Sequence, residues 1–173
     1  MAKELKQSSS EMDAIDIIRG QWAKEFPEIN TLPMGILGRL IRLTKHLENH
    51  IAQWLKEHGL LMGEFDVLMT LRRSGAPYQM TPSDLLNSMM LTSGAMTNRL
   101  DKLEAKALIA RQHSEVDRRS VEVALTAQGL ELINGILDAY VQEQAAVMDC
   151  FSPAQQKALD GELALWLTKF EAR

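Results

Sequence analysis

The 173-residue sequence has a single cysteine, no long apolar run and no excess of positive charge. The single cysteine, Cys150, excludes a disulfide within the chain and is typical of a protein kept in a reducing cytosol. The opening stretch, MAKELKQSSSEMD, lacks the apolar core of a signal peptide. No stretch approaches the roughly eighteen consecutive apolar residues that a membrane span needs. We therefore expect a cytoplasmic protein that has no membrane partner.

The patterns of enzyme active sites are also missing. The sequence contains no Gly-rich phosphate loop, no nucleophile elbow and no convincing set of metal ligands. His46 and His50 have a spacing that can bind metal, but HLENH is not HExxH, and both histidines fall on the polar face of a predicted helix. Cys150 has no basic neighbours in sequence that would favour a reactive thiolate, so an incidental thiol is preferred over a redox sensor. We expect no enzymatic activity, no cofactor and no metal.

The formal net charge of −4 hides an uneven distribution of charge along the chain. Residues 92–120 carry six basic and four acidic side chains, a local charge of +2, so the remainder of the chain carries −6. Such clustering matters more than the total charge when a surface must meet phosphate. The basic side chains of this segment are Arg99, Lys102, Lys106, Arg111, Arg118 and Arg119.

Apolar residues at helical spacing predict several helices in the first part of the chain. Residues 1–10 are expected to form a flexible polar tail, and Ser8 with Glu11 has the pattern of a capping box that starts a first helix. Two further helices are expected at about 32–57 and 62–74. The apolar stripe of the first helix consists of Met12, Ile15, Ile18, Trp22 and Phe26.

Two amphipathic helices are also predicted at the end of the chain. Thr126 is a suitable N-cap for the first of them, and Ser152 with Pro153 has the pattern of a second helix start. The terminal helices can bury their apolar stripes within one subunit or in a dimer, and we favour the dimer. The stripe of the last helix consists of Leu159, Leu163, Trp166 and Phe170.

The middle of the chain has the order helix, short helix, turn, second helix and hairpin. Thr81 as N-cap and Pro82 at the first helical position start the short helix, and Thr92 or Ser93 opens the next. After Leu108 the apolar period changes from helical to two, which predicts a β-hairpin with a long polar tip. The sequence therefore predicts a mainly α protein with a small β-hairpin, folded as a winged helix-turn-helix.

This architecture assigns candidate DNA contacts. An α-helix fits the major groove, and its N-terminal residues can reach base edges while the preceding helix crosses the backbone. Short polar side chains and a glycine that permits close approach lie near that N-terminus, and the hairpin tip can place an arginine on phosphate. The alternative is a solvated helix and a surface turn with ordinary charges, which the whole ordered set disfavours. The candidate DNA contacts are Ser93, Gly94, Thr97, Asn98 and Arg118.

The segment DRRSVEVALTAQGLELI resembles the wing and following helix of MarR-type transcriptional regulators. It matches their D-x-R…L-T-x-x-G pattern, and MTNRLDKLEAKALIAR resembles their recognition helix and first wing strand; the resemblance covers about residues 33–171. It implies a homodimer with interleaved N- and C-terminal helices, in which Asp117 and Arg119 stiffen the wing and Arg118 contacts DNA. The matching positions are Asp117, Arg119, Leu125, Thr126 and Gly129.

This resemblance divides the chain into four parts. Residues 1–10 are the tail, 11–60 the N-terminal helices of a ligand and dimer arm, 61–125 the winged helix-turn-helix, and 126–173 the C-terminal dimerisation helices. A two-fold dimer reads a pseudo-palindromic site in double-stranded DNA, with half-sites about one helical turn apart.

A finer resemblance is to the urate-responsive, PecS/HucR-like branch of the family. It implies that Trp22, Asp66, Arg99 and Arg111 line or couple to a ligand pocket between the dimer arm and the DNA-binding lobe. An indole can stack on a flat purine anion, and a guanidinium suits its oxygens. Trp22 can instead fill a core, and Asp66 can be an ordinary cap or surface acid; a phenolic or other aromatic acid is the alternative ligand.

We therefore expect a DNA-binding transcriptional regulator, a repressor released from its operator by a small aromatic anion such as urate. An anion that competes with Asp66 for Arg99 would disturb the recognition helix that carries Arg99. Such an anion acts as a switch if it binds the DNA-binding and the released state of the protein with different affinity. The alternative is a helical dimer that binds a ligand or a protein without reading DNA.

Overall fold

A computed structural model describes residues 12–89, 96–113 and 121–171. The chain divides into two compact units at Met62 and Gly63, and each is considered separately. No helix in the described part of the chain is long and apolar enough to cross a membrane.

From residue 12 onward the first unit contains two helices, α1 (Ala14–Glu25) and α2 (Leu32–Glu57). Asp13 is the N-cap of α1, because its side chain accepts hydrogen bonds from the backbone N–H groups of Ile15 and Asp16. Asp16 completes a capping box by accepting from the backbone of Asp13. The helix therefore starts later than the predicted cap at Ser8 and Glu11, a pair that lies outside the described residues.

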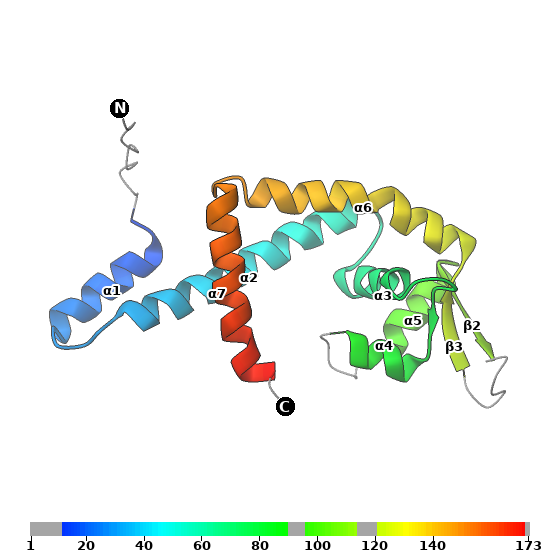
Figure 1. Cartoon of the computed structure of the whole chain (residues 1–173), viewed down its shortest axis with the longest axis horizontal. Coiled ribbons are helices and arrows are strands. Elements are labelled where there is room, and N and C mark those ends of the chain that lie inside the picture. Colours follow the sequence, from blue (N-terminus) through cyan, green and yellow to red (C-terminus); the bar gives the residue numbers. More distant parts are fainter. Residues whose placement is uncertain (1–11, 90–95, 114–120, 172–173) are drawn as a thin grey trace. The chain divides into compact units, whose positions relative to one another are not determined.

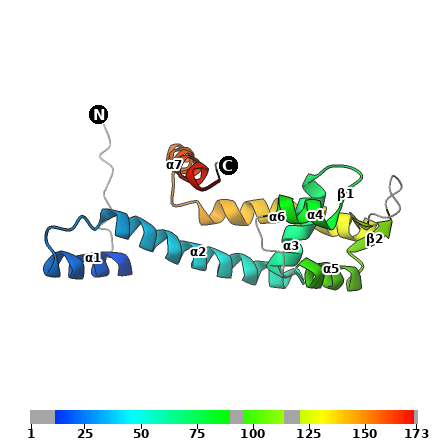
Figure 2. The same ribbon diagram turned by 90° about the horizontal axis from the view of Figure 1, so that it is seen from below.

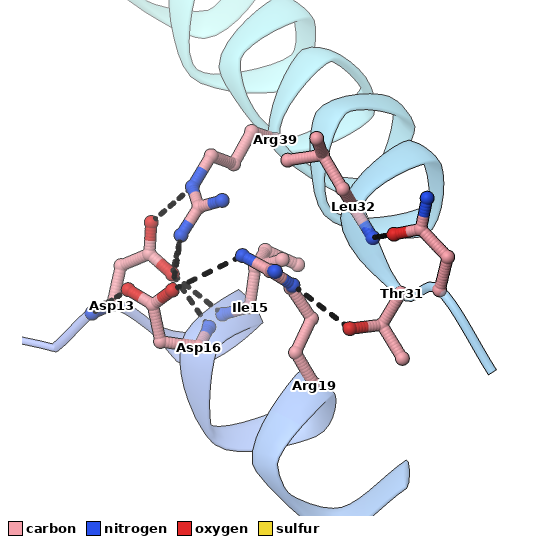
Figure 3. Close-up of polar contacts among 8 residues, drawn as sticks. Asp13, Ile15, Asp16, Arg19, Thr31, Leu32 and Arg39 are labelled. Carbon is pink, nitrogen blue, oxygen red and sulfur yellow. Dashed lines mark hydrogen bonds and ion pairs between the residues drawn. The ribbon is translucent and has the colours of Figure 1, made fainter. Parts of the chain in front are cut away.

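Ion pairs join the capped end of α1 to α2 (Figure 3). Arg39 on α2 donates from Nε to Asp13 over 2.8 Å and from Nη2 to Asp16. The hydrogen bond from Arg39 lowers the pKa of the Asp13 carboxyl to about 2. Arg19 donates to the Thr31 hydroxyl over 3.3 Å. These contacts hold α1, which carries Trp22, alongside the first turns of α2.

Within its described residues, the second unit contains five helices and three short strands. The helices are α3 (Met62–Arg73), α4 (Pro82–Ser88), α5 (Met96–Ala105), α6 (Ala127–Val147) and α7 (Pro153–Glu171). Figures 1 and 2 show α3, α4, α5 and the strands gathered around the first half of α6, with α7 turning away at its other end. The core of this unit is apolar and includes Phe65, Leu68, Leu71, Leu85, Leu100, Leu103, Val123 and Ile133.

The strands are β1 (Gln79–Met80), β2 (Ile109–His113) and β3 (Val121–Leu125), paired antiparallel in the order β1-β3-β2. The predicted hairpin is confirmed, with Arg111 opposite Val123. The sequence did not predict β1, because a two-residue strand has no detectable alternation and depends on its pairing with β3. Gln79 also donates to Glu122 and accepts from Gln112, which ties the three strands together.

The Leu-Thr-x-x-Gly stretch has a structural role where β3 meets α6. The Thr126 hydroxyl accepts from the Gly129 N–H over 3.0 Å as N-cap of α6, and it donates to the Ala107 carbonyl over 2.7 Å. Gly129 is buried, and a Cβ there would collide with the backbone carbonyl of Leu108. The first turn of α6 therefore packs directly on the connection between α5 and β2.

The predicted start of the last helix is also confirmed. Ser152 donates from its backbone to the Gln155 side chain over 2.9 Å at the first turn of α7. No residue of α7 is buried, and most of its large apolar side chains are exposed in the single chain, whereas Trp166 is half-buried. The exposed fractions are 40% for Leu163, 65% for Leu165 and 77% for Phe170.

Candidate nucleic-acid interface and ligand pocket

Helix α5 has one apolar and one polar face. Met96, Leu100 and Leu103 are buried, as predicted. Thr97, Asn98, Asp101 and Lys102 are exposed on the other side. The exposed face therefore offers hydroxyl, amide, carboxylate and ammonium groups, the chemistry needed to read base edges and contact phosphate.

The preceding helix α4 is fixed at both ends. Its N-cap Thr81 accepts from the Asp84 N–H over 3.1 Å and donates to the Asp84 carboxylate over 2.7 Å, which confirms the predicted helix start. At the other end, Arg73 of α3 donates to the backbone carbonyl of Ser88 over 2.6 Å. Helices α3 and α4 are thus linked by a charge-assisted hydrogen bond.

The end of α5 is held from α3. Glu64 is 2% exposed, and its carboxylate accepts from Lys106 Nζ over 2.7 Å. A buried carboxylate needs such a partner because burial penalises its charged form. The contact joins the first turn of α3 to the residue that follows α5.

Several predicted site residues lie outside the described residues. Ser93 and Gly94 fall within residues 90–95, and Asp117, Arg118 and Arg119 fall within residues 114–120. Their predicted roles in DNA contact and in stiffening the wing stay predictions. Thr97 and Asn98 are the predicted DNA contacts whose exposure the structure describes.

Arg111 lies on β2 and is bound to two carboxylates of α5. Its Nη2 contacts Asp101 over 2.7 Å and its Nη1 contacts Glu104 over 2.6 Å. Glu104 also accepts from the backbone N–H of Arg111 over 3.2 Å. These hydrogen bonds, led by that to Asp101, raise the pKa of the Arg111 guanidinium. Arg111 therefore joins the hairpin to α5 and is already paired.

Asp66 is half-buried and lines a pocket of about 320 Å³ in the second unit. Burial raises the pKa of its carboxyl group, and the nearby Arg99 partly offsets the rise. Phe65 and Tyr140 meet edge to face across this pocket, with ring centroids 4.7 Å apart. The remaining lining residues are Met69, Thr70, Arg73, Ser88 and Met89.

Arg99 reaches from α5 to the first turn of α3. Its guanidinium lies so close to Gly63 that a Cβ there would collide with it. Among the residues that the structure describes, its buried Nη1 atom has no hydrogen-bond partner. The structure therefore brings Asp66 and Arg99 together and leaves an unused donor on the arginine.

Trp22 belongs to the first unit. It is 41% exposed and lies on α1 with its ring centroid 5.7 Å from that of Phe26. The interpretation of Trp22 as a residue that fills the core of its own unit does not suit this exposure.

Tyr140, Arg73 and Glu64 were not among the site residues predicted from the sequence. Tyr140 lies on α6 and contacts Phe65 of α3 only through tertiary packing, so no local sequence pattern indicates that it lines the pocket. Glu64 stands two residues before Asp66 in a largely apolar stretch, which was a usable signal for a buried acid.

In the described ranges no group of three or more histidine, cysteine or acidic side chains is placed to hold a metal ion. Cys150 is exposed and follows α6.

Comparison with known proteins identifies the fold and the family. A model of the MarR family matches residues 60–121. The transcriptional regulator PecS of Dickeya dadantii is 34% identical over 148 residues, which cover 86% of this chain and 89% of PecS. The chain belongs to the MarR family. It is therefore a DNA-binding transcriptional regulator, and regulators of this kind are not enzymes.

Solved MarR-type structures share the fold. AbsC from Streptomyces coelicolor, itself a MarR family regulator, superposes with a TM-score of 0.74 at 20% identity, over 84% of this chain and 98% of AbsC. BpsR from Bordetella bronchiseptica superposes with a TM-score of 0.64 at 24% identity, over 75% of this chain and 91% of BpsR. The DNA binding of BpsR is regulated by 6-hydroxynicotinic acid. The predicted winged helix-turn-helix is thus confirmed.

Proposed function

We propose that this MarR-family protein is a cytoplasmic repressor that binds a pseudo-palindromic operator as a homodimer and is released by a small aromatic anion such as urate. The observation that carries the proposal is the pocket at Asp66, which lies next to an arginine of the recognition helix α5. A ligand there can act on the DNA-reading element through one side chain.

Helix α5 is the proposed reader of the major groove. Thr97 and Asn98 stand exposed in its first turns, where a recognition helix contacts base edges. Ser93 and Gly94 precede them in sequence, and Arg118 is the proposed phosphate or minor-groove contact of the wing. Asp117 and Arg119 are proposed to stiffen the wing around it.

The pocket suits a flat anion. Phe65, Met69 and Tyr140 offer aromatic and thioether surfaces, on which a planar ring can pack. Arg73 lines the same pocket, and Arg99, whose charge acts on Asp66, has a buried Nη1 without a hydrogen-bond partner among the described residues and is the proposed guanidinium donor. The regulation of BpsR by 6-hydroxynicotinic acid, a small aromatic acid, supports this ligand class.

Release follows from competition for Arg99. In the free protein Asp66 is the charge that faces this arginine, and its burial is unfavourable. An anion that pairs with Arg99 replaces Asp66 and alters the position of α5, so it binds the state with low DNA affinity more tightly. From the family resemblance, Trp22 and Arg111 are also proposed to line the ligand site or to couple to it.

A homodimer explains the exposed apolar residues of the terminal helices. Ile41 on α2 is 71% exposed, and Phe170 on α7 is 77% exposed. Large exposed apolar side chains in such number are typical of a subunit interface. Residues 11–60 and 126–173 are therefore the proposed arms of the dimer, and 61–125 the DNA-binding part.

Replacement of Arg118 by alanine tests the DNA-binding face. The variant should bind all duplexes more weakly, and the slope of log affinity against log salt should fall by about one, because one phosphate contact is lost. Replacement of Lys157 on α7 by alanine is the matched control and should leave the slope unchanged. Equal slopes for the Arg118 variant and the wild type would exclude the phosphate contact.

A further inference from the structure

Asp101 and Glu104 place two negative charges on the exposed side of the proposed recognition helix. Asp101 lies one helical turn after Thr97, so the two side chains share a face of α5. Asp101 and Glu104 are 58% and 40% exposed in their side chains. Uncompensated carboxylates at this position would repel the phosphates of a duplex.

The guanidinium of Arg111 forms an ion pair with each of these two carboxylates. Arg111 contacts Asp101 and Glu104 with separate nitrogens over 2.7 and 2.6 Å, and its side chain is only 29% exposed. Glu104 also holds the backbone N–H of Arg111 over 3.2 Å. Strand β2 is thus fixed to α5 through both the side chain and the main chain of one residue.

The position of Arg111 in the sheet extends this constraint to the whole hairpin. Arg111 is paired with Val123 of β3, and Val123 is fully buried. The connection from α5 to β2 is short and hydrogen-bonded, with the Leu108 N–H donating to the Leu103 carbonyl over 3.0 Å. The guanidinium therefore closes a small loop between helix and hairpin, and it does so on the exposed side of α5.

We propose that Arg111 is a positioning residue for DNA binding: it fixes the β2–β3 hairpin to α5 and neutralises the carboxylates of Asp101 and Glu104. The helix and the hairpin then meet the duplex as one preorganised surface. This role rests on the proposed use of α5 and the hairpin in DNA binding. It differs from a direct phosphate contact, for which the guanidinium would have to leave its two partners.

A double-mutant cycle distinguishes positioning from phosphate contact. The full-length wild type, Arg111→Ala, Asp101→Asn/Glu104→Gln and the triple variant are titrated with a labelled duplex from the region upstream of the protein's own gene. Arg111→Ala should lower the affinity on the order of tenfold, a loss of about 1.4 kcal/mol of binding free energy. In the background without the two carboxylates, the same substitution should change the affinity less than twofold.

Two further measurements complete the test. Arg111→Lys keeps the charge but cannot fork to two carboxylates, so it should bind DNA nearly as weakly as Arg111→Ala. The salt slope of Arg111→Ala should fall by clearly less than one, because no phosphate contact is lost. An equal loss in both backgrounds, with a slope smaller by about one and a lysine variant that binds like the wild type, would overturn the proposal in favour of a phosphate contact.

Hydrogen exchange of the free protein separates this proposal from the proposed function. In Arg111→Ala, the amides of β2 and β3 should exchange faster, while those of α6 stay protected. Unchanged exchange in the hairpin would overturn the positioning role whether or not the chain binds the chosen duplex. Failure of the wild type to bind any duplex, with faster exchange in the variant, would instead count against the proposed function of α5 and the hairpin alone.

Discussion

Asp66 shows how the burial of a single ionisable side chain can lower the stability of the fold. Its carboxyl lies in a pocket lined by Phe65 and Tyr140, and burial raises its pKa. The acid therefore binds its proton more tightly in the folded chain than in the unfolded one. Between the two pKa values, stability must fall as the pH rises, because the unfolded chain releases the proton first.

Replacement of Asp66 by asparagine should therefore stabilise the protein at pH 7. The midpoint of thermal unfolding should rise relative to the wild type, and the difference should shrink as the pH falls from the raised pKa of the folded chain toward the ordinary pKa of aspartate, 3.8, below which it should be lost. Melting curves between pH 3 and 8 measure this directly. A variant that melts lower than the wild type at pH 7 would show that the interaction with Arg99 outweighs the penalty of burial.

At this scale the sequence identified part of the site. Asp66 was detectable because an acid within an apolar run needs a reason to be there, and Arg99 because the family resemblance pointed to it. Tyr140 and Arg73 were not detectable, since they join the pocket only when α6 and α4 pack on α3. The pairing of Arg111 with α5 was also hidden, because a residue on a strand gives no local sign of the helix it contacts.

At the scale of secondary-structure elements, a close contact joins α6 to the α5–β2 connection. Gly129 permits it, because its Cα lies against the Leu108 carbonyl. Thr126 reinforces it with one accepted and one donated hydrogen bond. The Leu-Thr-x-x-Gly pattern thus has a structural role in the packing of α6 on the α5–β2 connection.

Replacement of Gly129 by alanine should destabilise the fold by about 3 kcal/mol, because the new methyl group meets backbone that cannot move away freely. Gly135, in the same helix with open space around its Cα, is the matched control. There alanine should stabilise by about 0.5 to 1 kcal/mol through helix propensity. Urea unfolding measures both values, and equal effects at the two positions would refute the packing argument.

The elements that were predicted correctly are those with local signals. Thr81, Thr126 and Ser152 start their helices as expected, because a cap bonds to the backbone two or three residues later. The first helix begins at a different cap, Asp13, because several polar residues in that stretch could serve. Strand β1 was not predicted because it depends on pairing with β3, which lies more than forty residues later in the sequence.

At the scale of the whole molecule, the terminal helices account for the large apolar surface of the isolated chain. Leu163 of α7 and Ile41 of α2 are exposed, although both lie in amphipathic helices. Burial of such surface stabilises by about 25 cal/mol per Å² of apolar area removed from water. The proposed homodimer would bury these faces and would also supply the two-fold symmetry that suits a pseudo-palindromic operator.

Replacement of Leu163 by glutamate should convert the dimer to a monomer. A charge on the apolar stripe of α7 cannot be buried without a partner, whereas in the single chain the same position is 40% exposed and tolerates it. Thr168→Glu, on the opposite side of the helix, should remain dimeric. Sedimentation equilibrium at micromolar concentration distinguishes the two, and a monomeric wild type would contradict the dimer.

The most direct test of the account is an anisotropy titration of the full-length protein on a duplex from the region upstream of its own gene, with a shuffled duplex alongside. We predict a preference for the upstream sequence on the order of 10³-fold at physiological salt. We also predict that saturating urate weakens this binding about fivefold or more. Equal affinity for both duplexes, or an affinity for the upstream duplex that urate leaves unchanged, would contradict a ligand-released regulator of this kind.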